Sequence, residues 1–595
     1  VLVAMNMCNP PKDGIFSPAV MSRFMPTALA PSSEPHIFGS VLGVWRRAWT
    51  AEAPKPQLVL LTGDSASGKS ELFKQAWRCL VQLQSPRTAS GPAPSNPTSM
   101  DADRAVEDAT LLLACFTDVP TQLHGDSSRS AKVLTLRFLR EGGALSGCKV
   151  QAPALSVVDG LGTFSQDYPS YTKWFRIFHH MILGSNAQQR MEYKFDSEAF
   201  SSPIPDMQGS TFSPFSPEEH SAAFSRVHEA MGRLNIPLLT RTAMFKFMAG
   251  LLHLSHLRLG GDESVSVEQP RALPVIEELL GIKEETLEVA LCKQEKKFGK
   301  EVEIMAISRK DAVASQRSLV RTLYGGLVDF MLESVNAFLA ATFGAVTELA
   351  LSSVASVTVV DGFGAETTTR ANLDKFCRNY AAEKLHRVFV KKIFSDLMTE
   401  VIMEGIPISV VESAEFSTEN DELVDALEAD PDGLLAAIQA QTDVQKPSPS
   451  TFISDLAGRL NKKQIKSKRI NTPWNKAGNE SFVVVHTSGS VTYLVSDFFD
   501  DNNILVKDKL ATLLRESTNE ATRMLAERCL PPARANSTGA GGGGGRRLAS
   551  KKKMALETFK KDIDALTERE RRLFSDHIKK LDRRLAPGIF KLHWT

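Results

Sequence analysis

The sequence lacks an excess of charge of either sign. Its 595 residues contain 70 Lys and Arg against 69 Asp and Glu, which gives a formal net charge of +1 at pH 7. A chain this neutral offers no global electrostatic reason to bind nucleic acid or an anionic membrane surface. Any attraction to a charged partner must therefore come from a local cluster of residues.

Cysteine is also scarce. The seven cysteines are scattered, none forms a CxxC pair, and their number is odd. This usage is typical of buried free thiols in a reducing compartment, and it argues against a disulfide framework or a zinc site. His179 and His180, like His253 and His256, have apolar helical surroundings without Cys or carboxylate partners, so we expect core or surface histidines and not metal ligands.

No long hydrophobic run predicts a membrane span. The least charged stretch, residues 337–360, contains only Glu348 as a charged residue, but it is rich in Ser, Thr and Gly. It predicts the end of a buried helix followed by a core strand. No signal-peptide pattern is visible, and because the chain begins with Val in a strand-like apolar run, we expect an upstream segment.

What the sequence does contain is a complete phosphate-binding motif. An apolar strand pattern at residues 58–61 is followed at residues 62–71 by Thr-Gly-Asp-Ser-Ala-Ser-Gly-Lys-Ser-Glu. In such a loop the glycines let backbone N–H groups surround phosphate oxygens, the lysine reaches the β- and γ-phosphates, and the next hydroxyl ligates Mg²⁺. The helix predicted over residues 70–83 directs its positive end at the same phosphates. The motif predicts a nucleoside triphosphate site; the alternative is a Gly/Ser loop that only closes a strand–helix turn.

Hydrolysis needs two more elements: a loop that senses the γ-phosphate and a carboxylate beside the metal. Residues 124–132, His-Gly-Asp-Ser-Ser-Arg-Ser-Ala-Lys, supply two hydroxyls and an arginine directly before a strand pattern. Residues 359–366, Val-Val-Asp-Gly-Phe-Gly-Ala-Glu, place an acid at the end of a buried strand, followed by a glycine whose N–H could reach a γ-phosphate. Taken singly, each segment is more often a solvated turn.

In this order and together, the three segments resemble the motor domain of myosin. The myosin phosphate loop reads GESGAGKTE, and residues 63–71 read GDSASGKSE. The first myosin switch reads NxNSSRFGK against HGDSSRSAK at residues 124–132, and the second reads DIxGFE against DGFGAE at residues 361–366. The following myosin helix contains NYxxEKLxxxF, which residues 379–389 match. Weaker matches in the same order extend the resemblance over about the whole chain.

The resemblance implies an α/β fold, with a P-loop NTPase core, a central mostly parallel or mixed twisted sheet, and large helical subdomains around it. It divides the chain into five parts, of which the first is an N-terminal part with purine loop and P-loop (residues 1–110) and the second an upper subdomain with switch one (residues 111–360). The third part, residues 361–535, contains switch two, the relay helix, a lower actin-binding-like subdomain and a transducer hairpin. A flexible Gly-rich basic loop (residues 536–553) and a C-terminal helical segment (residues 554–595) complete the chain.

The resemblance also implies a role for each matching residue. Ser127 would lie near the attacking water, Gly364 would bond the γ-phosphate, and Arg129 would pair with Glu366 to close the site. The expected cofactors are ATP and Mg²⁺. The metal would be held by Ser70 and Ser128, with Asp361 one layer behind them. The nucleotide-binding residues would be Asn9, Pro10, Gly63, Asp64, Ser65, Ala66, Ser67, Gly68, Lys69, Ser70 and Glu71.

The actin filament is the implied macromolecular partner. A run of glycines precedes a basic cluster consisting of Arg546, Arg547, Lys551, Lys552 and Lys553. In myosin the loop at this place contacts acidic actin, a salt-sensitive charge attraction; the alternative is a solvated basic linker. We therefore expect a cytoplasmic, cytoskeleton-associated motor ATPase. Light chains or other subunits would lie outside this segment, and we expect neither nucleic acid binding nor membrane insertion.

Other residues depart from the myosin pattern. His124 and Asp126 replace the asparagines of switch one, and an Asp near triphosphate adds repulsion. Gly362 and Ala365 replace Ile and Phe in switch two. No converter, lever arm or IQ motif is recognised before Thr595, so we expect either that they lie outside this segment or that the protein gives no stroke. A nucleotide-binding scaffold without turnover is the main alternative, and an unrelated P-loop NTPase is the third.

Overall fold

The computed structural model describes residues 14–25, 34–50, 56–65, 67–83, 99–120, 127–139, 143–155, 174–197, 216–261, 265–298, 301–346, 354–367, 371–390, 403–405, 419–444, 448–462, 464–472, 480–496, 498–504, 506–530, 553–554, 557 and 559–565.

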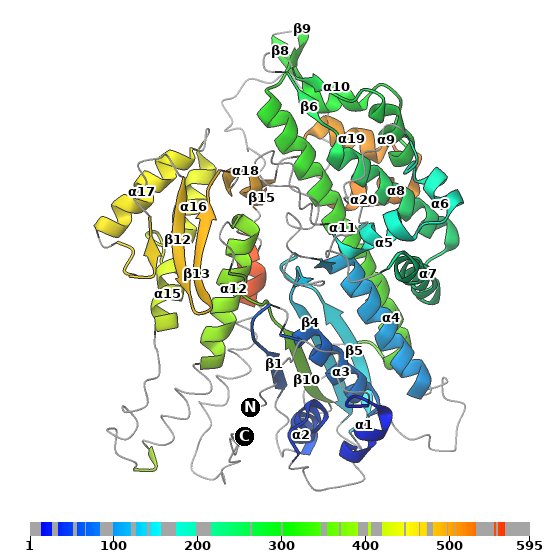
Figure 1. Cartoon of the computed structure of the whole chain (residues 1–595), viewed down its shortest axis with the longest axis vertical. Coiled ribbons are helices and arrows are strands. Elements are labelled where there is room, and N and C mark those ends of the chain that lie inside the picture. Colours follow the sequence, from blue (N-terminus) through cyan, green and yellow to red (C-terminus); the bar gives the residue numbers. More distant parts are fainter. Residues whose placement is uncertain are drawn as a thin grey trace, which may run out of the picture.

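A four-stranded sheet carries the phosphate-binding motif (Figure 1). Its strands are β1 (Gln57–Leu61), β10 (Val354–Asp361), β4 (Lys132–Leu139) and β5 (Leu145–Gln151), hydrogen-bonded in that order. β1 runs parallel to β10, whereas β4 is antiparallel to both β10 and β5. The expected mixed sheet is confirmed, but the described strands are not mostly parallel. For the β4–β5 pair the physical reason is the short connection between the two strands, which suits antiparallel neighbours, whereas parallel strands need a long crossover.

Two helices connect this sheet to the loops around it. α2 (Ile37–Thr50) and α3 (Lys69–Val81) pack against each other and against β10. Both contribute large buried side chains, among them Phe38 and Trp77. The preceding α1 (Pro18–Phe24) packs on α2 and begins at Ser17, whose side chain accepts a hydrogen bond from the Val20 N–H. β10 is buried along nearly its whole length, which fits the predominance of Val and Ala in its sequence.

A large helical body lies beside the sheet (Figure 1). Its helices are α4 (Ser99–Thr117), α5 (Arg176–Gly184), α6 (Ala187–Glu192), α7 (Pro217–Arg233), α8 (Leu238–His256), α9 (Ala272–Leu280), α10 (Leu287–Cys292), α11 (Arg309–Phe343), α19 (Asp508–Arg515) and α20 (Glu520–Cys529). The short pair β6 (Leu259–Gly260) and β7 (Ser266–Val267) and the hairpin of β8 (Lys293–Phe298) and β9 (Glu301–Ala306) extend it. α20 packs on α8 and α11, although the sequence division groups it with residues 361–535.

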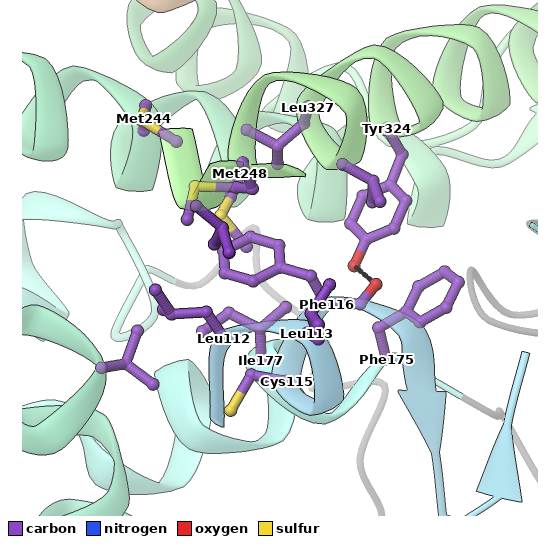
Figure 2. Close-up of a cluster of buried hydrophobic side chains, with 14 of the residues drawn as sticks. Leu112, Leu113, Cys115, Phe116, Phe175, Ile177, Met244, Met248, Tyr324 and Leu327 are labelled. Atoms are coloured by element: carbon purple, nitrogen blue, oxygen red, sulfur yellow. Dashed lines mark hydrogen bonds between the residues drawn. The ribbon is translucent and has the colours of Figure 1, made fainter. Parts of the chain in front are cut away.

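The core of this body joins α4 to α11 (Figure 2). Phe116 near the end of α4 lies beside Tyr324 of α11, and the Tyr324 hydroxyl donates a hydrogen bond of 2.9 Å to the Phe116 carbonyl. The Phe175 ring stacks on Tyr324 at a centroid distance of 4.5 Å. All three side chains are buried. Because α4 ends one residue after Phe116, this cluster holds the point where the chain turns toward the sheet.

Among the described residues, α11 alone is long and apolar enough to cross a membrane by length and composition. Leu323, Tyr324 and Leu327 on this helix are buried, and the helix contacts β5, α4 and α20. These packing contacts bury part of its apolar surface.

A second hydrophobic core forms around α12 (Leu373–Val390), which covers the first part of the predicted relay helix. The hairpin predicted in this region is confirmed, because β12 (Ser481–His486) pairs antiparallel with β13 (Gly489–Leu494). The other elements here are α15 (Glu419–Glu428), α16 (Leu434–Asp443), α17 (Pro449–Asn461), β11 (Ile470–Asn471), α18 (Phe498–Asn502), β14 (Asn503–Ile504) and β15 (Lys553–Met554). Phe559 and Ile563 from the helical residues 559–565 are buried in the same core.

Candidate functional site

The phosphate-binding loop lies between β1 and α3. Gly63 and Gly68 have positive φ angles of +144° and +91°, a conformation that L side chains rarely adopt, so glycine is required at both turns. Gly68 is the N-cap of α3. The buried Lys69 ammonium donates to Gly63 O at 2.9 Å, to Asp64 O at 2.6 Å and to Ser67 Oγ at 3.3 Å. Burial lowers the pKa of Lys69, and the nearby Asp361 and Asp64 carboxylates oppose this shift.

Ser70 and Asp361 meet at the end of the parallel strand pair. The register pairs Leu61 of β1 with Asp361 of β10, so the phosphate loop and the aspartate leave the sheet at the same edge. Ser70 Oγ donates to Asp361 Oδ2 at 2.7 Å. Burial raises the pKa of Asp361, while Lys132, the Ser70 hydroxyl and Lys69 hold it down. The hydroxyl and the carboxylate therefore lie together beside the loop lysine.

The described part of switch one begins as a short strand. β3 (Ser127–Ser128) pairs antiparallel with β2 (Asp118–Val119), which directly follows α4. Ser127 Oγ lies 3.5 Å from Ser65 Oγ in the phosphate loop and donates to Glu366 Oε1 at 3.2 Å. Ser128 Oγ turns the other way and donates to Asp118 Oδ1 at 2.9 Å. The two neighbouring serines thus contact different carboxylates.

Arg129 and Glu366 form an ion pair. Arg129 Nη1 lies 2.8 Å from Glu366 Oε1, and the arginine side chain is completely buried while the glutamate is 13% exposed. Arg378 of α12 reaches the second oxygen, with Nη2 3.2 Å from Glu366 Oε2. The Glu366 carboxylate therefore connects switch one, switch two and the first turns of α12.

Switch two lies directly against the phosphate loop. The Ser65 N–H donates to Ala365 O at 3.4 Å. A Cβ on Gly364 would lie 2.4 Å from Ser65 N, closer than real atoms approach, so only glycine permits this contact. Gly362 is tightly packed as well, because a Cβ there would lie 2.8 Å from Leu385 Cδ1. The two glycines are therefore sites of close packing in this structure.

A chain of buried polar groups leads from Glu366 into the second core. Its N–H donates to Asn379 Oδ1 at 2.9 Å, and Asn379 Nδ2 donates to Glu366 O at 3.1 Å and to the Tyr493 hydroxyl at 2.8 Å. His486 Nε2 lies 2.7 Å from the same hydroxyl, and its Nδ1 lies 3.5 Å from Glu383 Oε1. Burial alone would raise the pKa of Glu383, but contacts with His486 and with the Thr487 N–H and hydroxyl lower it.

Other predicted site residues lie apart from this cluster or outside the described residues. Glu71 is exposed on α3, and its Oε1 accepts a hydrogen bond from Gln75 Nε2 at 2.6 Å. Only the backbone of Lys553 is described, in β15 beside Ile504. The residues outside the described parts are Asn9, Pro10, Ala66, His124, Asp126, Arg546, Arg547, Lys551 and Lys552.

Comparison with known families agrees with this geometry. The family model described as myosin head (motor domain) matches residues 1–579. The chain belongs to the myosin head family. It is 25% identical to unconventional myosin-IXb of Rattus norvegicus over 478 residues, which cover 79% of this chain and 22% of that protein.

Two further relatives show the same level of similarity to this myosin head. Unconventional myosin-XIX of Xenopus laevis is 24% identical over 523 residues, covering 86% of this chain and 50% of that protein. Myosin-51 of Schizosaccharomyces pombe is 24% identical over 493 residues, covering 82% of this chain and 31% of that protein. The chain thus spans half or less of the length of the relatives named here.

The donor groups of this myosin head fit a magnesium–triphosphate ligand. Two hydroxyls, Ser70 and Ser128, each bond a buried aspartate, and oxygen donors of this kind suit Mg²⁺. Lys69 supplies a positive charge at the N-terminal end of α3, where helix geometry also favours an anion. Sequence reasoning missed Asp118 and Arg378 because neither stands in a recognisable local pattern, and it assigned no role to Lys132 although this lysine ends the switch-one motif.

Proposed function

We propose that this myosin head binds ATP with Mg²⁺, hydrolyses it, and links that reaction to binding of an actin filament. The observation that carries the proposal is the Arg129–Glu366 ion pair, which joins the two switches at 2.8 Å next to the phosphate loop. An ion pair at this place closes one side of the site and keeps bulk water from the γ-phosphate.

The phosphate loop and α3 bind the triphosphate in this proposal. The left-handed conformation at Gly68 begins α3 at Lys69, so the first backbone N–H groups of the helix face the loop. Lys69 exchanges its present bonds to the Gly63 and Asp64 carbonyls for the β- and γ-phosphate oxygens. Since the ammonium is partly desolvated, its attraction to a phosphate is stronger than it would be in water.

Ser70 and Ser128 are the proposed protein ligands of the metal, and Asp361 orients Ser70 from behind. When bound, Mg²⁺ neutralises charge on the β- and γ-phosphate oxygens. Asp361 accepts a hydrogen bond of 2.7 Å from the Ser70 hydroxyl, which leaves the hydroxyl lone pairs directed away from the carboxylate.

Switch two positions the attacking water in this proposal. The Gly364 N–H binds the γ-phosphate, while the Ser127 hydroxyl and the Glu366 carboxylate, which lie 3.2 Å apart, hold the water in line. Arg129 and Arg378 fix that carboxylate from both sides. Positioning and electrostatic stabilisation of this kind account for most of the catalysis in phosphoryl transfer.

The altered side chains of switch two do not remove its contact with the phosphate loop. Ala365 makes that contact through its backbone carbonyl, which accepts the Ser65 N–H whatever the side chain is. This favours turnover over the scaffold alternative.

Actin binding is assigned to the basic cluster of Arg546, Arg547, Lys551, Lys552 and Lys553. A concentrated positive charge on a chain of net charge +1 suits an acidic filament surface, and the attraction falls with salt. The cytoskeletal localisation follows from this partner.

The test is steady-state Mg²⁺-ATPase activity of the purified protein with and without filamentous actin. We expect actin to raise wild-type turnover, and Glu366→Ala to abolish it. Glu333→Ala is the matched control, because Glu333 also pairs with an arginine, Arg528, but is 64% exposed on α11. ATP binding without turnover would support the scaffold instead, and turnover indifferent to actin would remove the filament from the proposal.

A further inference from the structure

Asp118 is a buried carboxylate next to the proposed metal ligands. It is 4% exposed and directly follows the last residue of α4. In the β2–β3 pair it stands opposite Ser128. Thr117 Oγ1 also donates to its Oδ1 at 3.0 Å. Neither the phosphate loop nor the two switches include this residue.

The hydrogen bonds of Asp118 fix the orientation of the Ser128 hydroxyl. Ser128 Oγ donates to Asp118 Oδ1 at 2.9 Å, and Lys132 Nζ donates to Ser128 Oγ at 2.9 Å. Lys132 is also ion-paired with Asp118 at 3.1 Å. A serine hydroxyl has one proton and two lone pairs. The Ser130 carbonyl is a second acceptor for this proton, but it is farther away, at 3.2 Å. With the hydroxyl proton directed at Asp118 and one lone pair bonded to Lys132, a single lone pair is left for a metal.

This arrangement repeats the one on the other side of the site. The Ser70 hydroxyl donates a hydrogen bond to Asp361, just as the Ser128 hydroxyl donates one to Asp118. The register of β10 and β4 places Asp361 opposite Lys132, so the two hydroxyl–aspartate pairs are neighbours. Each of the two hydroxyls is thus held by a buried carboxylate. Oxygen donors beside negative charge of this kind suit a divalent cation.

We propose that Asp118 is a positioning residue for Mg²⁺ in this myosin head, acting through the Ser128 hydroxyl. The inference rests on the proposed function, because it assumes that Ser128 is a metal ligand. A carboxylate that accepts a hydrogen bond from a metal ligand fixes the orientation of that ligand and raises the ligand's basicity. Loss of such a carboxylate typically lowers metal affinity by about 10- to 100-fold. The competing view is that Asp118 only neutralises Lys132 as a structural ion pair.

The test is an equilibrium titration with Mg²⁺ of the protein saturated with a fluorescent ADP analogue. For Asp118→Asn we expect Mg²⁺ to bind about 10- to 100-fold more weakly, because the amide is a poorer acceptor for the Ser128 proton. The affinity for the nucleotide without metal should stay within about twofold of wild type, since Asp118 acts on the metal ligand and not on the phosphates.

A double-mutant cycle separates positioning from simple charge. In the Ser128→Ala background, adding Asp118→Asn should change Mg²⁺ affinity by less than about twofold, because the hydroxyl through which Asp118 acts is gone. Additive losses in the double variant would overturn the inference. Asp108→Asn is the matched control, since Asp108 is likewise a buried aspartate in an ion pair; it lies on α4 and is paired with Arg233 at 2.6 Å. It should leave Mg²⁺ affinity unchanged.

Asp118→Asn leaves Lys132 with a weaker partner and could for that reason prevent folding. In that case the same Mg²⁺ titration is made on the charge-balanced variant that combines Asp118→Asn with Lys132→Met. Its net charge equals that of the wild type. Because Lys132 also donates to Ser128 Oγ, the reference for this variant is Lys132→Met alone. The inference predicts Mg²⁺ affinity about 10- to 100-fold below that of Lys132→Met, whereas a role limited to neutralising Lys132 predicts equal affinity. If the wild-type protein itself shows no Mg²⁺-dependent nucleotide binding, the proposed function fails. If the wild-type protein binds Mg²⁺ and nucleotide but the Asp118 variants bind Mg²⁺ as tightly as their reference proteins, the inference alone fails.

Discussion

Arg129 Nη1 donates to Glu366 Oε1 across 2.8 Å, joining two segments that are 237 residues apart in the chain. The contact lies where switch one, switch two and the phosphate loop converge, and Arg378 holds the other carboxylate oxygen. Glu366 is therefore the residue on which the closed arrangement of the two switches depends most directly.

Gly364→Ala should abolish turnover while the protein still folds and binds ATP. The added Cβ would lie 2.4 Å from Ser65 N, so switch two must move away from the phosphate loop and lose the Ser65–Ala365 hydrogen bond. The measurement is single-turnover cleavage together with nucleotide affinity. Gly458→Ala on α17 is the control, because nothing lies within 4 Å of a Cβ there, and an alanine inside a helix stabilises by about 0.5–1 kcal/mol. Wild-type cleavage by Gly364→Ala would refute this close-packing argument.

Tyr493→Phe should destabilise the protein by about 1–3 kcal/mol, the cost of leaving buried polar partners unsatisfied. The hydroxyl accepts from Asn379 Nδ2 at 2.8 Å and lies 2.7 Å from His486 Nε2. Since Asn379 also bonds the backbone of Glu366, turnover should fall at temperatures where the variant is still folded. Thermal unfolding and ATPase assays on the same samples measure both effects. A lower melting temperature with unchanged turnover would limit this chain of polar groups to a structural role.

Acid should destabilise the helical body through its buried histidines. Burial lowers the pKa of His253 to about 4, and His253 Nε2 lies 3.1 Å from Tyr193 O. Because the folded-state pKa lies below the ordinary value near 6.5, the unfolded chain binds the extra proton first. The stability is complete above about pH 6.5 and is lost as pH falls toward 4, by about 2 kcal/mol for this histidine at pH 5. His253→Gln should flatten the decline in melting temperature between pH 7 and pH 5; an unchanged slope would show that His253 does not contribute.

The local patterns in the sequence predicted much of the site. The phosphate loop and the buried strand ending at Asp361 follow from residue spacing and apolar runs within short windows, and the structure has both of them. The pairing of Arg129 with Glu366 was reached through the family resemblance, because spacing alone cannot bring together residues so far apart.

What the sequence could not predict are contacts made by single residues from distant segments. Asp118 is a lone acid after a helix, and its partners Ser128 and Lys132 come from the next two strands. Arg378 likewise carries no pattern of its own. Such contacts depend on which strands become neighbours, and the order β1-β10-β4-β5 in the sheet differs from the order of these strands in the chain.

The most direct test of the central claim is a single-turnover measurement of ATP cleavage by wild type and Glu366→Ala, with ATP affinity measured in parallel. The claim is that the Arg129–Glu366 pair closes a hydrolytic site. It predicts that both proteins bind ATP and that the variant cleaves at least about 100-fold more slowly, the scale of losing one positioned electrostatic group. Equal cleavage by the two proteins, or no cleavage by the wild type, would contradict it.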